Sequence, residues 1–426
     1  MKAVVLAAGE GVRLKPITST RPKHLIKVAG IPILEKCLKE IKESGIDEVL
    51  IVVHFMADAI CRHFQEGTSL GLKIEYVKQE GILGTGNAIC LAEPYVKDDF
   101  LVVYGDLLFN TDAIRRVIRL HGEKRTDVVM TIVPVEHPEN YGIVELEDEG
   151  DVKRLVEKPS RDDSSSNMAN AGIYVFSTGI FEEIKKTKAS ARGEWEITDA
   201  ISQLLVKGKN VLTVEIPKES WFDIGRPWDL LEANRWALMN MKHKICGCVE
   251  SDAHLVGPVT VAETAYIRSG AYVEGPTIID EESDIGPNCY IRPYTSIGRK
   301  VRIGNACEVK NSIIMDNTHI GHLSYIGDTI VGQNCNLGAG TVTANLRLDD
   351  KNIKMSVKDV MVDSGRRKLG AVLGDGVKSG INALFMPGIK VGCNSWIGPN
   401  VVVERDLAAD KILLLKQTLE ERNLEK

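Results

Sequence analysis

Residues 279–309 read IDEESDIGPNCYIRPYTSIGRKVRIGNACEV, and every sixth residue of this stretch is isoleucine or valine. The period also extends toward the N-terminus. Ten consecutive positions six residues apart carry an aliphatic side chain: Leu255, Val261, Ile267, Val273, Ile279, Ile285, Ile291, Ile297, Ile303 and Val309. If Leu, Ile and Val fill about a quarter of all positions, ten such hits in succession occur by chance about once in a million. The period therefore indicates a repeated structural unit.

A glycine follows many of these aliphatic residues, as in Ile285-Gly286 and Ile297-Gly298. The phase shifts after Val309, and the repeat resumes at Ile320-Gly321 and again at Leu373-Gly374. Neither the helical period of 3.6 nor the strand period of 2 requires a glycine at a fixed place in every six residues. A hexapeptide β-helix does, because one aliphatic side chain points inward from each flat face and a small neighbour permits the corner. We therefore predict a left-handed parallel β-helix, whose narrow interior also explains the aromatic content of only 5%.

The first half of the chain has a different pattern, in which short apolar runs alternate with amphipathic ones. We expect strands at residues 2–8, 48–53, 73–77, 99–104 and 127–133, and helices at residues 33–41, 112–120 and 227–241. This alternation predicts an α/β domain of Rossmann-like type, with a mostly parallel sheet covered on both faces. Ligands bind such sheets at the carboxyl ends of the strands, which places residues 8–11 and 105–106 at the functional edge.

These patterns divide the 426 residues into four parts. We predict an α/β domain over 1–227, a linker helix over 228–249, the β-helix over 250–405 and a C-terminal helix over 406–426 that caps the last coil. Between Leu346 and Leu369 the repeat lapses and basic residues gather: Lys351, Lys354, Lys358, Arg366, Arg367 and Lys368. This segment is expected to leave the wall of the coil.

Composition excludes several classes of protein. The net charge of −6 favours neither nucleic acid nor an anionic membrane surface, and no apolar run approaches the ~18 residues of a membrane span. The nine cysteines are an odd, scattered set rather than a disulfide framework, which favours a cytoplasmic protein with reduced thiols. Cys246-Gly-Cys248 lacks the Cys-x-x-Cys spacing and a second ligand pair, so we do not predict a metal site there.

A glycine-rich loop, Leu6-Ala7-Ala8-Gly9-Glu10-Gly11-Val12-Arg13, follows the first predicted strand. The backbone amides of such a loop can hold phosphates, and the nearby cations Arg13 and Lys23 suit a triphosphate. From these residues alone, a tight turn with solvated charges is an equally weighted alternative.

The same loop, continued by Pro22-Lys23, closely resembles that of the sugar-1-phosphate nucleotidylyltransferases. Further motifs of that family follow in order up to about residue 230: Gln79 with Leu83-Gly84-Thr85-Gly86, Tyr104-Gly105-Asp106, Tyr141-Gly142, Glu157-Lys158-Pro159, Asn170-Ala171-Gly172 and Phe222-Asp223-Ile224-Gly225. The resemblance implies that the nucleotide, UTP or dTTP, is bound by Leu6, Ala8, Gly9, Gly11, Gln79, Gly84 and Thr85. It implies sugar-phosphate contacts from Gly142, Glu157, Lys158 and Asn170.

The resemblance also assigns Arg13 and Lys23 as catalytic cations and Asp106 and Asp223 as Mg²⁺ ligands. The chemistry agrees, because attack of a sugar-phosphate oxygen on the α-phosphorus gathers several negative charges at one place. Mg²⁺ keeps several waters and needs only one or two protein carboxylates. Taken on its own, Asp223 is also compatible with a helix-capping role.

Motifs in the second half resemble the acetyltransferase part of the bifunctional glucosamine-1-phosphate acetyltransferases and N-acetylglucosamine-1-phosphate uridyltransferases. They are Ile291-Arg292-Pro293, Glu308-Val309-Lys310, the run from Gly321 to Asp328 and the run from Asn336 to Thr341. The resemblance makes His322 the general base on the sugar amine, which suits imidazole because it titrates near neutral pH. It implies sugar and phosphate contacts from Arg292, Lys310, Tyr325, Asn336, Asn345 and Lys351, acetyl-CoA contacts near Ala339, Gly380 and Gly398, and a homotrimer or dimer of trimers.

One departure concerns Asn345-Leu346-Arg347-Leu348-Asp349, where the bacterial enzymes carry Asn-Tyr-Asp-Gly. In this respect the chain looks like archaeal bifunctional relatives, and Lys351 and Lys354 either replace some phosphate contacts or form a solvated face. Two alternatives stay open. One is a glucose-1-phosphate thymidylyl- or uridylyltransferase whose β-helix only oligomerises, and the other is a non-catalytic regulatory subunit.

Overall fold

The computed structural model describes residues 1–147, 151–160, 166–190 and 193–423. The chain forms two compact units. The first comprises Met1–Gly11, Arg21–Lys27 and Ile31–Ile224, and the second comprises Val12–Thr20, Val28–Gly30 and Gly225–Lys426. None of the helices in the described ranges has the length and hydropathy that a membrane span needs.

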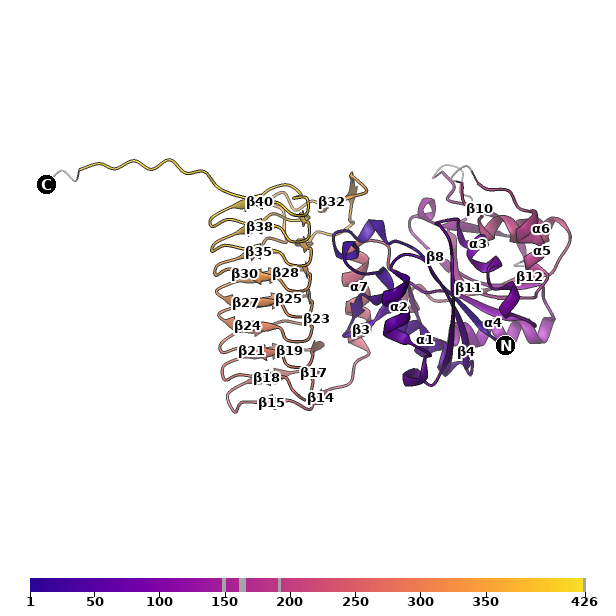
Figure 1. Cartoon of the computed structure of the whole chain (residues 1–426), viewed down its shortest axis with the longest axis horizontal. Coiled ribbons are helices and arrows are strands. Elements are labelled where there is room, and N and C mark those ends of the chain that lie inside the picture. Colours follow the sequence, from indigo (N-terminus) through magenta and orange to yellow (C-terminus); the bar gives the residue numbers. More distant parts are fainter. Residues whose placement is uncertain (148–150, 161–165, 191–192, 424–426) are drawn as a thin grey trace. The chain divides into compact units, whose positions relative to one another are not determined.

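The first unit is built on a nine-stranded sheet (Figure 1). Its main path is β10 (Val152–Glu157), β9 (Gly142–Leu146), β11 (Met168–Phe176), β6 (Phe100–Tyr104), β1 (Ala3–Ala7), β4 (Glu48–Val53) and β5 (Lys73–Lys78). Strand β8 (Val128–Pro134) pairs with β11 and with β12 (Val211–Glu215). Only β10 and β11 run against the rest of the sheet: β11 is antiparallel to β6, β8 and β9, and β10 is antiparallel to β9. The other seven strands share one direction. The predicted, mostly parallel sheet is confirmed.

Helices cover both faces of this sheet, and the side chains of β1 alternate between the two sides. Val5 packs into one core with α1 (Ile33–Glu43) and α4 (Thr111–Lys124), and Val4 packs into another with α3 (Thr85–Cys90), α5 (Ile180–Lys186) and α6 (Ile197–Val206). Helix α2 (Ala57–Phe64) lies with the first core. Two short pairs complete the strands: β2 (Lys27–Val28) with β3 (Ile31–Pro32), and β7 (Leu107–Phe109) with β13 (Trp221–Asp223).

The C-terminal part of the second unit begins with α7 (Pro227–Met239) and continues as a β-helix of three parallel sheets (Figure 1). The predicted linker helix over 228–249 extends too far, because residues 244–245 and 248–249 already pair with the next coil of the β-helix. The first sheet holds β14 (Lys244–Ile245), β17 (Val259–Val261), β20 (Thr277–Ile279), β23 (Thr295–Ile297), β26 (Ile313–Ile314), β29 (Ile330–Val331), β34 (Val372–Leu373) and β37 (Lys390–Val391). The second holds β15 (Cys248–Val249), β18 (Tyr266–Ile267), β21 (Asp284–Ile285), β24 (Arg302–Asn305), β27 (His319–His322), β30 (Asn336–Leu337), β35 (Lys378–Ser379), β38 (Trp396–Ile397) and β40 (Ile412–Leu413). The third holds β16 (His254–Val256), β19 (Tyr272–Glu274), β22 (Tyr290–Ile291), β25 (Glu308–Lys310), β28 (Tyr325–Gly327), β31 (Val342–Thr343), β36 (Leu384–Phe385) and β39 (Val402–Val403).

The six-residue period of the sequence is the period of the coil. Ile267 pairs with Ile285, and Ile285 with Ile303, each one coil of three hexads further along, and all three are fully buried. Between the faces, one residue per hexad turns the corner with a positive φ: Glu282, Asn288, Tyr294, Lys300 and Ala306. The predicted parallel β-helix is confirmed.

The phase shift after Val309 has a structural cause. The corner Lys310-Asn311-Ser312, between the third and first sheets, is one residue short, and so is Gly327-Asp328-Thr329 one coil later. In the next coil the chain leaves the wall at this same corner, after Asn345. It forms the hairpin of β32 (Lys354–Val357) and β33 (Val360–Asp363), and it returns where the Gly370 N–H donates to the Asp328 carbonyl. The predicted excursion is confirmed.

The predicted C-terminal helix over 406–426 is wrong for the described residues up to 423. That segment contains the strand β40, in which Ile412 pairs with Trp396 of β38, and then continues without helix (Figure 1). Leu414, Leu415 and Leu419 are at least half exposed. A helix of this length is marginal in water unless an apolar face packs against a partner, and within the described part of this chain these leucines remain exposed.

Candidate active sites

A cavity of about 230 Å³ lies at the carboxyl edge of the first unit's sheet. The predicted nucleotide-binding residues Leu6, Ala8, Gly9, Gln79, Gly84 and Thr85 all line it, together with Asp106. They meet because β1, β5 and β6 are parallel and end at the same edge. Gly11 does not line this cavity. Tyr104, from the motif Tyr104-Gly105-Asp106, also lines the cavity. The remaining lining residues, which the sequence did not single out, are His24, Ile82, Ala88 and Glu194.

Gln79 is held rigidly in the cavity wall. Its Nε2 donates to the Gly84 carbonyl at 3.3 Å and to Asn87 Oδ1 at 2.9 Å. The Oε1 atom is therefore the end of the amide that can accept a hydrogen bond from a ligand, such as the ring N–H of uracil or thymine. Gly84 has a φ of +92°, and a Cβ there would lie 2.6 Å from the Trp195 carbonyl oxygen, so the turn requires glycine.

His24 is a buried residue of the same cavity wall. Burial lowers its pKa to about 4, although Asp106 opposes that shift, so the imidazole is neutral at neutral pH. Its Nδ1 atom has no hydrogen-bond partner in the described part of the chain. Nothing in the sequence marked His24 as a cavity residue except its position directly after Lys23.

The two predicted metal ligands are brought together by the pairing of β7 with β13, in which Asp223 lies opposite Leu107, the neighbour of Asp106. The Lys23 ammonium lies 2.5 Å from Asp106 Oδ2 and 4.0 Å from Asp223 Oδ1. Both carboxylates are partly exposed. Two partly exposed carboxylates, of which Asp106 lines the cavity, fit Mg²⁺, which fills its remaining positions with water and phosphate oxygens. Among the described residues, no group of three or more His, Cys, Asp or Glu side chains forms a fuller metal site, and Cys246 and Cys248 are exposed free thiols.

Three of the predicted sugar-phosphate residues also meet. A Cβ on Gly142 would lie 2.8 Å from Glu157 Oε2 and 3.8 Å from the Asn170 Cβ. The Thr198 hydroxyl donates to Glu157 Oε2 at 3.4 Å. Lys158 lies beside them, with its ammonium 3.5 Å from Glu157 Oε1 and about half of its side chain exposed. The cluster combines a carboxylate that can accept hydrogen bonds with a half-exposed cation.

A tyrosine pair connects this cluster to the nucleotide cavity. The Tyr104 hydroxyl, in the cavity wall, lies 3.0 Å from the Tyr174 hydroxyl, which also accepts a hydrogen bond from Asn170 Nδ2 at 2.5 Å. Burial raises the pKa of both phenols, so both stay protonated. Sequence reasoning did not identify Tyr174, because a tyrosine inside a buried strand looks like an ordinary core residue.

Arg13 lies in the segment Val12–Thr20, which belongs to the second unit. A Cβ on Gly225 would lie 3.2 Å from its guanidinium carbon, so the guanidinium packs directly on the backbone there.

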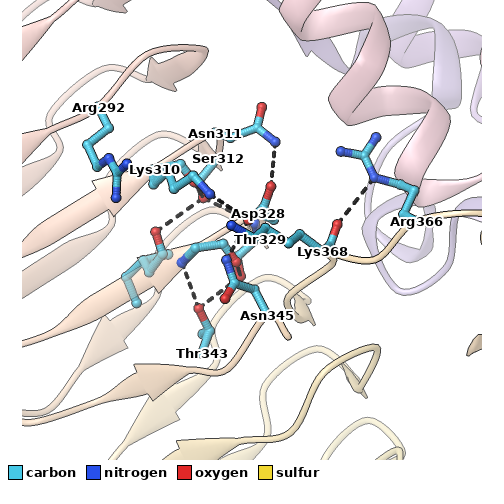
Figure 2. Close-up of polar contacts among 12 residues, drawn as sticks. Arg292, Lys310, Asn311, Ser312, Asp328, Thr329, Thr343, Asn345, Arg366 and Lys368 are labelled. Atoms are coloured by element: carbon cyan, nitrogen blue, oxygen red, sulfur yellow. Dashed lines mark hydrogen bonds and ion pairs between the residues drawn. The ribbon is translucent and has the colours of Figure 1, made fainter. Parts of the chain in front are cut away.

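In the β-helix, the predicted phosphate-binding residues gather at the shortened corner between the third and first sheets (Figure 2). Arg292 NH1 donates to Glu308 Oε1 at 2.8 Å, and the buried Nε of Arg292 has no partner among the described residues. Lys310 Nζ lies 3.6 Å from Asp328 Oδ2, and Asn345 Nδ2 donates to the Tyr325 hydroxyl at 3.1 Å. Burial raises the pKa of Tyr325, which therefore stays a hydrogen-bond donor.

His322 is the last residue of β27 in the second sheet, at the corner where the chain turns into the third sheet, and it is exposed. Its carbonyl accepts from the Gly340 N–H. Gly338, Gly380 and Gly398 stack at this corner, where a Cβ on Gly338 would be 2.6 Å from the carbonyl carbon of Gly380 and one on Gly380 would be 3.0 Å from that of Gly398. Ala339 belongs to the same corner, and Asn336 is exposed on the second sheet. Lys351 is exposed in the excursion and is not part of either group.

Comparisons with known proteins match both halves of the chain. A family model described as nucleotidyl transferase matches residues 2–239, and one described as the GMPPB C-terminal domain matches residues 273–380. A UDP-glucose pyrophosphorylase structure in complex with UDP-glucose, 26% identical, covers 55% of this chain and 96% of its own, with a TM-score of 0.50.

Two relatives match over the whole length. The bifunctional protein GlmU of Methanococcus maripaludis is 46% identical over 98% of this chain and 98% of its own. A bifunctional sugar-1-phosphate nucleotidylyltransferase/acetyltransferase of Sulfurisphaera tokodaii is 40% identical over 96% of this chain and 98% of its own. The chain therefore belongs to the nucleotidyl transferase family and, over its full length, to the bifunctional GlmU family.

Proposed function

We propose that the chain catalyses two consecutive reactions. The β-helix unit transfers an acetyl group from acetyl-CoA to the amine of glucosamine 1-phosphate or galactosamine 1-phosphate. The first unit then transfers a nucleotidyl group from UTP or dTTP to the acetylated sugar 1-phosphate and releases pyrophosphate. One observation carries the proposal, namely that a chain similar to bifunctional relatives from end to end holds both residue clusters. The free cysteines, with Cys37, Cys289 and Cys307 buried, are consistent with a cytoplasmic location.

In the nucleotidyl transfer, a phosphate oxygen of the sugar attacks the α-phosphorus, and the bond to the leaving pyrophosphate breaks. Gln79 would orient the base, while Lys23 and Arg13 would neutralise the triphosphate. Glu157 would accept hydrogen bonds from the sugar, and Lys158 would bind its phosphate. Asp106 and Asp223 would hold Mg²⁺, which supplies charge stabilisation at the phosphates. The attacking phosphate is already an anion, so no side chain has to remove a proton.

The decisive experiment for the function is a substrate panel on one preparation. Pyrophosphate release is measured with UTP, dTTP, ATP and GTP against the 1-phosphates of glucose, glucosamine, N-acetylglucosamine and galactosamine. CoA release is measured with the amino sugars. Activity with N-acetylglucosamine 1-phosphate and UTP or dTTP, together with CoA release, supports the proposal. Pyrophosphate release from glucose 1-phosphate without any CoA release would assign the β-helix a purely structural role.

Asp223→Asn tests the metal site. The variant keeps the size of the side chain but removes a charge that would hold Mg²⁺, so we expect nucleotidyl transfer to fall about 100-fold or more. The Mg²⁺ concentration for half-maximal rate should rise, and acetyl transfer should not change. Asp98→Asn, at an exposed position of the same unit, is the matched control. Unchanged pyrophosphate release in Asp223→Asn would make this residue structural.

Gly142→Ala tests the sugar cluster. The added methyl group would lie 2.8 Å from Glu157 Oε2 and displace that carboxylate. We expect the KM for the sugar 1-phosphate to rise about 10-fold, as for the loss of one or two hydrogen bonds, with little change in the KM for the nucleotide. The control is Gly122→Ala in α4, where a Cβ meets nothing within 4 Å. Equal KM values in both variants would contradict a sugar-binding role for this cluster.

In the acetyl transfer, the sugar amine attacks the thioester carbonyl. A C–N bond forms, the C–S bond breaks, and CoA leaves as a thiolate. His322 would take the proton of the amine, and Arg292 and Lys310 would bind the sugar phosphate with a hydrogen bond from Tyr325. Asn336 and Asn345 would position the sugar and the acetyl group. Acetyl-CoA would lie along the backbone at Ala339, Gly380 and Gly398.

His322→Ala tests the general base. Positioned general-base catalysis is worth about 10²- to 10⁴-fold, so CoA release should fall by that factor while nucleotidyl transfer stays near wild type. The KM for the amino sugar should change much less, because Arg292 and Lys310 remain. His319→Ala, an exposed histidine on the same strand, is the matched control. A parallel loss of both activities in His322→Ala would mean that the residue supports the fold.

A trimer is part of the proposal, because His322 and the phosphate-binding cluster lie at opposite edges of the third sheet within one chain. Packing of flat β-helix faces around a threefold axis would let one subunit's histidine serve a neighbour's phosphate site. We expect a trimer or a dimer of trimers in light scattering. A monomer with full acetyltransferase activity would contradict the arrangement.

A further inference from the structure

The shortened corner contains a buried carboxylate that none of the assignments above uses. The side chain of Asp328 is 4% exposed, and both of its oxygens are engaged (Figure 2). Oδ1 accepts from Asn311 Nδ2 at 2.6 Å, and Oδ2 accepts from Asn345 Nδ2 at 2.5 Å. The ammonium of Lys310 is 3.6 Å from Oδ2. A carboxylate is rarely buried to this extent without a partner or a role, because the loss of hydration is costly.

The corner itself does not require this charge. Asn311 occupies the equivalent place one coil earlier, and both residues have the positive φ that turns the chain, 45° for Asn311 and 49° for Asp328. Another corner builds the same kind of ladder from two amides, in which Asn382 Nδ2 donates to Asn400 Oδ1 at 3.2 Å. An asparagine at position 328 could therefore adopt the same positive φ and still accept the hydrogen bond from Asn311. What aspartate adds is a negative charge and a group that only accepts hydrogen bonds.

Because the Asp328 carboxylate can only accept hydrogen bonds, its neighbours must turn a donor toward it. The carboxamide of Asn345 could present either end to a partner, but opposite a carboxylate it has to present Nδ2. That leaves Oδ1 of Asn345 as the end available to a substrate. The same Nδ2 donates to the Tyr325 hydroxyl at 3.1 Å, so Tyr325 accepts there and its own proton is directed elsewhere. Asn345 Nδ2 therefore donates both to Asp328 and to the Tyr325 hydroxyl, and the carboxylate fixes this arrangement.

We propose that Asp328 is a positioning residue of the amino-sugar phosphate site. Its carboxylate fixes the orientation of the Asn345 amide, directs the Tyr325 hydroxyl proton toward the substrate, and keeps the Lys310 ammonium at the corner. The inference rests on the acetyl transfer proposed above and gives that site an anionic support that touches no substrate itself.

Asp328→Asn tests this role with the smallest possible change in shape. Asparagine can offer Asn345 either an N–H or a carbonyl, so the amide orientation is no longer unique. We expect kcat/KM for CoA release with the amino-sugar 1-phosphate to fall about 10- to 100-fold, the scale of a misplaced binding group. Asp410→Asn is the matched control, because Asp410 is also a corner residue with positive φ that accepts from an asparagine, Asn394. That variant should keep wild-type acetyl transfer.

A double-mutant cycle separates positioning from a merely structural effect. If Asp328 acts through Asn345, then Asp328→Asn should cost little in a chain that already carries Asn345→Ala. Additive losses would overturn the proposal, and so would wild-type acetyl transfer in Asp328→Asn. Unfolding temperature and nucleotidyl transfer are measured on the same preparations, and a loss of acetyl transfer that tracks a lower unfolding temperature also counts against it. If the wild type releases no CoA with any amino sugar, the proposed function fails, and the role of Asp328 fails with it.

Discussion

The narrow interior of the coil is the constraint on which the second unit depends. Each face admits one aliphatic side chain per hexad, so Ile267, Ile285 and Ile303 stack in one column, and the chain must turn sharply between faces. The turn needs a residue with positive φ, which short polar side chains and glycine tolerate best. As a result, the corners collect asparagine and aspartate, whose side chains form hydrogen-bonded ladders from coil to coil. The apolar core in this way determines where polar groups gather.

The shortened corner is where this regular pattern brings charged and amide side chains together. Removing one residue from two successive hexads keeps the core positions Ile314 and Val331 buried but tightens the outer turn. Lys310, Asp328 and Asn345 meet there, and the excursion leaves the coil at the same place (Figure 2). The Lys310 ammonium at this corner lies beside the Asp328 carboxylate, which holds it in place.

The first unit also brings charged side chains together, but it does so at the edge of a parallel sheet. Its parallel strands deliver Gly9, Gln79 and Asp106 to one edge, and the short pairing of β7 with β13 adds Asp223. Lys23 lies between the two carboxylates, so charges of both signs are in place before any phosphate arrives. In such a preorganised site, little rearrangement is needed when negative charge develops during the reaction.

The sequence alone determined the repeat, the alternation of strands and helices in the first half, and most residues of the cavity wall. These features are periodic or local, and a fixed period or a loop directly after a strand can be recognised without knowing the fold. The tertiary structure decided what depends on distant residues meeting. It placed His24 in the cavity wall and Tyr174 beside Tyr104, although no motif in the sequence marks either residue. It showed that the predicted C-terminal helix does not form in the described part of the chain, where the leucines of that segment are exposed. It also showed Asp328 between Asn311 and Asn345, a contact set by coil register and by two missing residues, which no local pattern encodes.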